Sequence, residues 1–267
     1  MVLQVRPQPS PTESPRNFWF ISIENLRKEY PNSKQVIRDL SLTARSGEFV
    51  SLLGASGCGK STLLKMIAGL SSISGGSIEI GGMIPQNARE IMSFVFQDST
   101  LLPWRTVARN VELALEFEGL SKPLRATRVD AVLKLVGLSE VSSYYPRQLS
   151  GGMKMRVSIA RALATTPQLL LMDEPFGALD AMTRNRLNEE LLVLKEKQRW
   201  TTLFVTHSIT EAVFLSDRIL LMASNPGRVV QEIAIPLGYP RTAELRSEPA
   251  FLALVGQVSR ALAAVHS

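Results

Sequence analysis

The chain has 267 residues, a formal net charge of +6 and a pI near 9.7. This length suffices for one large domain with a sizeable core. Its single cysteine, Cys58, excludes an intramolecular disulfide. A basic protein is attracted to nucleic acid or to an anionic membrane surface. However, Lys and Arg are scattered singly rather than gathered in a polybasic block, so the charge is interpreted as an ordinary solvated surface.

The two ends of the chain differ in character. Residues 1–17 are rich in proline and polar side chains and lack an apolar core, which predicts a disordered tail rather than a signal peptide. Residues 241–267 contain an apolar stretch that Gln257 and Arg260 interrupt and that is too short to span a bilayer. Its apolar side chains share one helical face, which predicts a docked amphipathic helix: Phe251, Leu254, Val255, Val258, Leu262 and Val265. The chain is therefore expected to be soluble by itself.

Between these ends, strand patterns alternate with helical periodicity in chain order. Strands are expected at 18–23, 36–43, 48–54, 77–80, 91–97, 168–173, 201–206 and 218–222. Helices are expected at 61–70, at 107–136 with a further stretch at 131–138, and at 153–164, 182–197 and 208–215. This alternation predicts an α/β fold with a mainly parallel sheet, in one domain over 18–240. The helical character of the middle part predicts a helical insert at about 99–157.

One glycine-rich segment lies between a predicted strand and a predicted helix. Residues 54–61 fit the pattern G-x-x-x-x-G-K-[ST] of a phosphate-binding loop. Glycines let backbone N–H groups turn towards a phosphate, and the following helix adds its positive end. Lys60 would reach the β- and γ-phosphates, and the Ser61 hydroxyl would bind Mg²⁺. The alternative, a tight turn with an incidental lysine, does not explain the order of strand, loop and helix.

The whole segment is expected to contact ATP: Gly54, Ala55, Ser56, Gly57, Cys58, Gly59, Lys60, Ser61 and Thr62. Cys58 occupies a variable position of the pattern. A place near a helix N-terminus is one of the environments in which a thiol becomes reactive. The simpler interpretation is a small residue that fills the loop.

An apolar run at 168–172 ends in the acids Asp173 and Glu174. A continuous apolar run is typical of a central parallel strand that is covered on both faces. Asp173 would hold Mg²⁺ through water, and Glu174 would polarise the attacking water. Adjacent acids are also common at solvent-facing strand ends, so the phosphate-binding loop is what favours the catalytic interpretation.

A second glycine segment, Leu149-Ser150-Gly151-Gly152, precedes a predicted helix. Ser150 can cap the helix, and the glycines let backbone N–H groups approach an anion. Because Lys60 already serves one γ-phosphate, a second cradle suggests the nucleotide of a partner chain. A plain capped helix after a Gly-Gly turn is the alternative.

Taken together, the motifs resemble, in order, those of ABC transporter ATPase subunits over residues 18–235. The resemblance rests on the phosphate-binding loop, Gln97, Leu149–Gly152, Asp173-Glu174, Ala178-Leu179-Asp180 and Thr206-His207. It implies an antiparallel β subdomain beside the P-loop core. It also implies a head-to-tail dimer with two ATP molecules, each held between the P-loop of one subunit and the Ser-Gly-Gly loop of the other.

The same resemblance assigns roles to four further residues. Gln97 touches Mg²⁺ and couples the site to the helical insert, Asp180 lies at the dimer seam and His207 contacts the γ-phosphate. Tyr30 stands where the family stacks an aromatic ring on adenine, although it could also be a surface tyrosine before a turn. The implied catalytic set is Glu174, His207, Lys60 and Gln97, and the implied Mg²⁺ set is Ser61, Gln97 and Asp173. Many members of the family have glutamine directly after the Ser-Gly-Gly loop, whereas this chain has Met153. Methionine at this position is similar to the sequences of one importer branch.

Two segments refine the resemblance. Residues 101–111 and 223–228 are similar to the nitrate, sulfonate and taurine branch of bacterial importers, and to related chains for pyrimidine precursors. The resemblance implies an ATPase that energises solute uptake through a separate membrane permease and, indirectly, a solute-binding protein. It would work at the cytoplasmic face of the inner membrane, with no nucleic acid as partner.

Two alternatives belong to other functional classes. A non-transport ABC ATPase acting on DNA would carry a long coiled-coil insertion between Lys60 and Leu149, and one acting on the ribosome would hold two such domains. A nucleotide-dependent binding module without turnover would lack a water-polarising base, but Glu174 is present.

Overall fold

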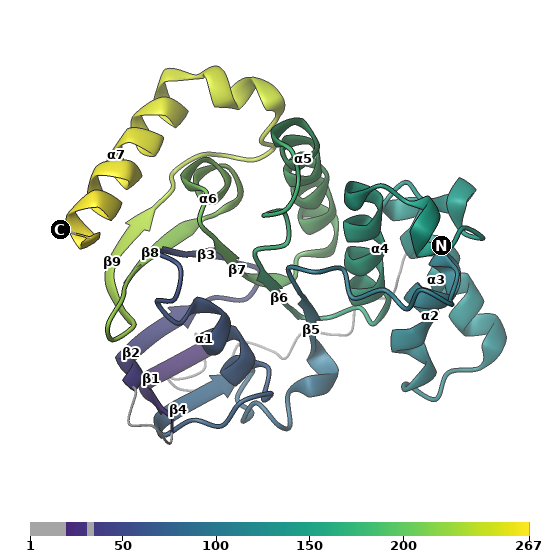
Figure 1. The fold of residues 1–267 in the computed structure, drawn as a ribbon, viewed down its shortest axis with the longest axis horizontal. Helices are drawn as coiled ribbons and strands as arrows, with labels where there is room; N and C mark the ends of the chain where they lie inside the picture. The colour runs from purple at the N-terminus through teal and green to yellow at the C-terminus, as the bar shows by residue number, and fades with distance from the viewer. Residues whose placement is uncertain (1–19, 31–34, 267) are drawn as a thin grey trace.

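The computed structural model describes residues 20–30 and 35–266. The predicted tail at 1–17 and the start of the first predicted strand lie outside the described residues. Two sheets and a group of helices make up the described chain (Figure 1). The resulting α/β architecture, mainly parallel with an added antiparallel sheet, confirms the predicted fold class.

The main sheet has six strands in the order β5-β6-β7-β3-β8-β9. Their bounds are Phe49–Gly54 (β3), Met92–Val95 (β5), Leu169–Asp173 (β6), Thr201–Thr206 (β7), Arg218–Ala223 (β8) and Arg228–Ala234 (β9). Strands β3 and β7 are buried along their whole length, as expected for central strands of a parallel sheet that is covered on both faces. All neighbours pair in parallel except β8 and β9. The carboxyl ends of β3, β6 and β7 therefore meet at one edge, where ligands bind in open parallel sheets.

A three-stranded antiparallel sheet in the order β2-β1-β4 lies below the main sheet in Figure 1. Its strands are Ile21–Glu29 (β1), Gln35–Ala44 (β2) and Gly75–Ile80 (β4). Ile21 pairs with Ala44 on one side and with Ile80 on the other. The apolar face of this sheet shares one core with helix α1 (Lys60–Ile67) and with one face of the main sheet. Helix α1, which follows the phosphate-binding loop, therefore packs between the antiparallel sheet and the main sheet.

The opposite face of the main sheet is covered by α5 (Ala181–Gln198), α6 (Ile209–Leu215) and α7 (Pro249–His266) (Figure 1). The six residues predicted to form the apolar face of the last helix do so: Phe251 and Val258 are buried, and Leu254, Val255, Leu262 and Val265 pack partly buried against the same core. Within the described part of the chain, no helix is both long and apolar enough to cross a membrane.

Three helices stand together beyond strands β5 and β6 (Figure 1). They are α2 (Val107–Glu116), α3 (Lys122–Leu135) and α4 (Gly151–Ala164). The periodic stretch predicted at 107–136 is thus two helices, because a turn that contains Gly119 at φ +67° separates them. Short 3₁₀ segments lie between these elements, at Arg89–Ile91, Ser139–Val141, Pro146–Gln148 and Ala243–Ser247.

Candidate functional site

The phosphate-binding loop leaves the buried strand β3 and enters α1. A Cβ on Gly54 would lie 2.6 Å from the carbonyl oxygen of Met222 and 3.0 Å from Cys58 Sγ, so only glycine fits there. Gly57 and Gly59 adopt φ values of +80° and +98°, a region that favours glycine. The glycines of the pattern therefore serve packing at the first position and backbone conformation at the others.

Lys60 points into this loop. Its Nζ donates to the carbonyl oxygens of Gly54 at 2.8 Å and Ala55 at 2.9 Å. The Cys58 thiol is 1% exposed and lies 3.8 Å from the same Nζ. This burial favours the interpretation of Cys58 as a residue that fills the loop. The ammonium group is held where a phosphate above the loop would meet it.

Ser61 and Asp173 meet beside the loop. Ser61 Oγ donates to Asp173 Oδ1 at 2.8 Å, which joins the start of α1 to the end of β6. Burial raises the pKa of the Asp173 carboxyl, against the lowering effect of the Ser61 hydrogen bond. Among the described residues, no three His, Cys, Asp or Glu side chains form a metal cage. Two oxygen donors without a cage suit Mg²⁺, which is usually held by one or two protein oxygens together with substrate phosphates and water.

A second group of polar side chains surrounds Glu174. Glu174 Oε2 lies 3.0 Å from His207 Nδ1, which links the ends of β6 and β7. A Cβ on Gly177 would lie 3.7 Å from both Glu174 Oε2 and Gln97 Nε2, so Gln97 shares this space. Glu174 has φ +45°, an uncommon conformation for a residue with a side chain, and strain of this kind clusters at functional sites. The structure thus brings together three side chains that lie far apart in the sequence.

The Ser-Gly-Gly segment forms a different site. Ser150 caps α4, and its Oγ accepts from the backbone N–H of Met153 at 3.3 Å. A Cβ on Gly152 would lie 2.7 Å from Thr183 Cγ2, so the first turn of α4 rests directly on the first turn of α5. Asp180 caps α5 by accepting from the backbone N–H of Thr183 at 3.0 Å. Hydrogen bonds from Thr183 lower the pKa of Asp180.

The two glycine segments do not meet within one chain. Helix α4 stands beside α2 and α3 and packs into the core on one face of the main sheet, whereas α1 packs against β6 and β7 on the other face (Figure 1). The structure therefore separates the predicted site residues into two groups. One group surrounds the phosphate-binding loop, and the other contains Ser150, Gly151, Gly152 and Asp180.

Tyr30 lies at the end of β1 and is 43% exposed. The Lys28 ammonium group lies 5.0 Å from the centroid of its ring. Lys28 itself is buried and donates to the carbonyl oxygen of Ser72 at 2.7 Å, in the segment after α1. The Lys28 side chain thus contacts the Tyr30 ring and also joins β1 to the segment that follows α1.

Arg161 was missed by the sequence-based predictions. It lies on α4, and its guanidinium donates to the carbonyl oxygens of Ser99 and Thr100, both at 3.0 Å, and to Thr100 Oγ1 at 2.9 Å. Burial lowers the pKa of this arginine. The loop that follows Gln97 is therefore hydrogen-bonded to α4, the helix that Ser150 caps. The sequence signal that could have identified Arg161 is its position among apolar residues of the predicted helix, where a buried arginine needs hydrogen-bond partners.

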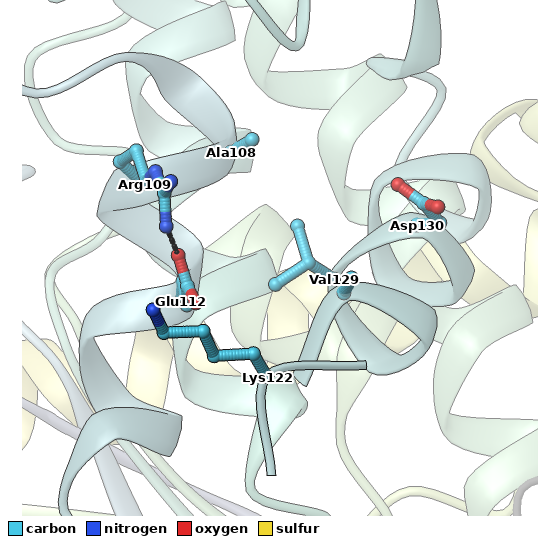
Figure 2. A pocket seen from close by; sticks show the side chains of 7 residues that line it. Ala108, Arg109, Glu112, Lys122, Val129 and Asp130 are labelled. Carbon is cyan, nitrogen blue, oxygen red and sulfur yellow. Dashed lines mark hydrogen bonds and ion pairs between the residues drawn. The ribbon is translucent and has the colours of Figure 1, made fainter. Parts of the chain in front are cut away.

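A pocket between α2 and α3 lies away from these residues (Figure 2). Arg109 and Glu112 form an ion pair on its α2 side, and Val129 of α3 points into it (Figure 2). Lys122, at the start of α3, also lines it. The pocket is a feature of the helical group and contains none of the predicted nucleotide-binding residues.

A glycine loop around a lysine, an adjoining hydroxyl–carboxylate pair and a parallel sheet define a P-loop nucleotide-binding protein. The chain belongs to the ABC transporter family, whose model matches residues 37–177. It is therefore an ATP-binding subunit, and the members of its family are the ATP-hydrolysing subunits of transporters. This result confirms the predicted family and activity, and nothing in the comparisons supports the nucleic-acid alternative.

Relatives and solved structures give the same family. The chain is 45% identical over 228 residues to the bicarbonate transport ATP-binding protein CmpD of Synechocystis sp., covering 83% of this chain and 81% of CmpD. It is 42% identical over 241 residues to the taurine import ATP-binding protein TauB of Shigella boydii, covering 88% and 93%. Among solved structures, it is similar to the dimeric post-hydrolysis ATP-binding cassette MJ0796 bound to ADP and Pi, with a TM-score of 0.73 and 33% identity over 82% of this chain and 100% of that one.

Proposed function

We propose that this chain is the ATPase subunit of an importer and that it works as a head-to-tail dimer with a second copy of itself. The observation that carries the proposal is the separation of the two glycine segments. One chain holds Lys60 and Glu174 in one group and Ser150–Gly152 in another, beside α2 and α3. A second copy that faces the first would complete both ATP sites. The dimeric state described for the related cassette MJ0796 supports this arrangement.

In the first half-site, residues 54–62 cradle the phosphates of ATP, and Tyr30 stacks on adenine. Lys60 neutralises charge on the β- and γ-phosphates from its place inside the loop. Ser61, Gln97 and Asp173, the last through water, are the residues that would hold Mg²⁺. Bound there, Mg²⁺ would neutralise phosphate charge.

The hydrolytic step uses Glu174 and His207. Glu174 accepts a proton from the attacking water, whose oxygen bonds to the γ-phosphorus as the bond to ADP breaks. His207 contacts the γ-phosphate and, at 3.0 Å, orients the Glu174 carboxylate. Gln97 lies near that carboxylate. It couples the nucleotide site to the helical group. The second copy contributes Ser150, Gly151 and Gly152 to the same γ-phosphate, and its Asp180 lies at the seam.

The remaining partners follow from the importer assignment. The helical subdomain, about 99–157 within an ATPase domain at 18–240, would dock on integral membrane permease subunits, with a solute-binding protein involved only indirectly. The chain would then lie peripherally on the cytoplasmic face of the inner membrane. Relatives named for taurine import and bicarbonate transport support a small solute, of the nitrate, sulfonate or taurine kind or a pyrimidine precursor. No nucleic acid is expected as a partner.

Replacing Glu174 by glutamine tests the assignment. The Glu174→Gln variant should bind ATP with the affinity of the unmodified chain, because the loop around Lys60 is untouched. It should lose hydrolysis and elute as a dimer in the presence of ATP. The control is Glu140→Gln, which changes an exposed carboxylate in the helical group. Hydrolysis by Glu174→Gln at the normal rate would refute the catalytic role. Copurification of a membrane protein with the tagged chain would test the importer assignment separately.

A further inference from the structure

Glu211 is a buried carboxylate that no motif of the family resemblance includes. It lies in the first turn of α6, only 5% exposed, and its backbone N–H donates to the Ser208 cap at 3.3 Å. Burial raises the pKa of this carboxyl, while the Thr206 hydrogen bond and the Arg184 charge lower it. A buried carboxylate is costly unless other groups hold it. Its partners therefore show what it does in the fold.

One partner lies directly beside His207. Glu211 Oε2 accepts a short hydrogen bond from the hydroxyl of Thr206, the last residue of β7. The same hydroxyl accepts from the backbone N–H of Ser208 at 3.0 Å. Glu211 therefore fixes the residue before His207 and, through the Thr206 hydroxyl, the residue after it.

The other partner braces the loop that follows Glu174. Glu211 Oε1 lies 3.7 Å from Arg184 Nε, so the two face each other as opposite charges without a hydrogen bond between them, and this oxygen has no hydrogen-bond partner among the described residues. The Arg184 guanidinium donates to the carbonyl oxygens of Leu179 at 2.8 Å and Phe176 at 3.3 Å. These carbonyls belong to the segment that joins Glu174 to the Asp180 cap of α5. The position of the segment thus depends on an arginine that Glu211 faces.

These contacts close a ring around the hydrolytic pair. Glu174 and His207 touch directly at 3.0 Å. They are joined a second time through Thr206, Glu211 and Arg184. We infer that Glu211 is a positioning residue for ATP hydrolysis, which together with Arg184 sets the place of His207 relative to Glu174. This inference rests on the proposed function of that pair.

Three substitutions break the ring at different points. Glu211→Gln keeps the side-chain size but removes the charge that faces Arg184, and Arg184→Met removes the donors to the loop. Thr206→Val keeps the shape but removes the hydroxyl. Each should lower kcat by about 10-fold or more while the Kd for ATP stays unchanged, because a displacement of ~1 Å in a site can cost ~100-fold in rate. Thr206→Ser, which retains the hydroxyl, should keep kcat several-fold above that of Thr206→Val.

A double-mutant cycle separates positioning from general stability. Glu211→Gln combined with Arg184→Met should lower kcat no further than the worse single variant, because both break the same connection. All rates are measured well below the melting temperature of each variant. The matched control is Glu189→Gln, which breaks the ion pair between α5 and Arg246 but touches no member of the ring, and it should leave kcat unchanged.

Two results would overturn the inference. One is a melting temperature that falls while kcat stays normal, which would make Glu211 a stabilising residue only. The other is an effect of Glu211→Gln that multiplies independently with that of Arg184→Met. Glu174→Gln is measured in the same assay. If Glu174→Gln is inactive but Glu211→Gln is normal, only this inference fails. If Glu174→Gln hydrolyses ATP normally, the proposed function itself fails.

Discussion

The contact between the first turns of α4 and α5 allows a quantitative test with two neighbouring glycines. A Cβ on Gly152 would lie 2.7 Å from Thr183 Cγ2, which is too close for two carbon atoms. A Cβ on Gly151 would lie 3.4 Å from Leu179 Cδ2, close to an ordinary contact. Gly151→Ala and Gly152→Ala are therefore the same chemical change in the same helical turn, with different neighbours.

Two opposing effects set the magnitude. Alanine is favoured over glycine in a helix by up to about 1 kcal/mol. Overpacking a tight contact costs about 1–3 kcal/mol. Gly151→Ala should therefore be neutral or slightly stabilising, whereas Gly152→Ala should lower the free energy of unfolding by up to about 2 kcal/mol. For a chain of this size, each kcal/mol corresponds to a change of about 2–4 °C in Tm.

The assay is thermal and denaturant unfolding without nucleotide, so that dimer closure does not contribute. Thr183→Ser removes the methyl group that a Cβ on Gly152 would meet, but keeps the backbone N–H that Asp180 accepts. Combined with Gly152→Ala, it should recover most of the lost stability. The packing argument is wrong if Gly152→Ala is as stable as Gly151→Ala, or if Thr183→Ser gives no relief.

Three further changes have expected outcomes. Gly227→Ala should weaken ATP binding by about 10-fold or more, because a Cβ there would lie 2.2 Å from the Cys58 carbonyl oxygen and displace the phosphate-binding loop; nucleotide titration measures this, and unchanged affinity would contradict it. Phe251→Ala should cost about 3–5 kcal/mol of stability by emptying the contact of α7 with α6, with no change in ATP affinity. Glu232→Gln tests pH dependence. The Arg218 hydrogen bond holds the pKa of Glu232 below its ordinary range, so its stabilisation is present near neutral pH and is lost as pH falls through that lowered pKa. In urea unfolding, the free energy of unfolding of Glu232→Gln should be less than about 1 kcal/mol below that of the unmodified chain, because this group is half-exposed. The difference in free energy should vanish in acid.

The central strands and the phosphate-binding loop could be predicted because their signals are local. Strand β6 is covered on both faces, and its first four residues form a continuous apolar run. Strand β9 was missed because it is an edge strand whose only buried residue is Ile233, which leaves no apolar alternation to detect. The stretch predicted at 107–136 shows the opposite error, since helical periodicity continues across the turn that contains Gly119.

The candidate site divides in the same way. Lys60 and Asp173 were predicted because loop and strand patterns surround them in the sequence. Arg161 and Glu211 were missed because each faces a residue that is distant in the chain: Arg161 donates to Thr100 across 61 positions, and Glu211 faces Arg184 of another helix. Neither contact has a local sequence signature, because only the packing of α4 and α6 on the rest of the fold creates it.

Helix α4 connects three parts of the site, and this has a mechanical consequence. Ser150 caps its first turn, which rests on α5 beside the Asp180 cap. Further along, Arg156 pairs with Glu190 of α5 at 2.7 Å. Arg161, in its last turn, holds the loop that follows Gln97. A movement of that loop would pull on α4, because the Arg161 hydrogen bonds join the two. A shift of α4 would in turn displace the Ser-Gly-Gly segment or strain the contacts with α5. Under the proposed function, the binding of ATP near Gln97 in one subunit would thus be coupled to the surface that the same subunit presents to its partner's nucleotide.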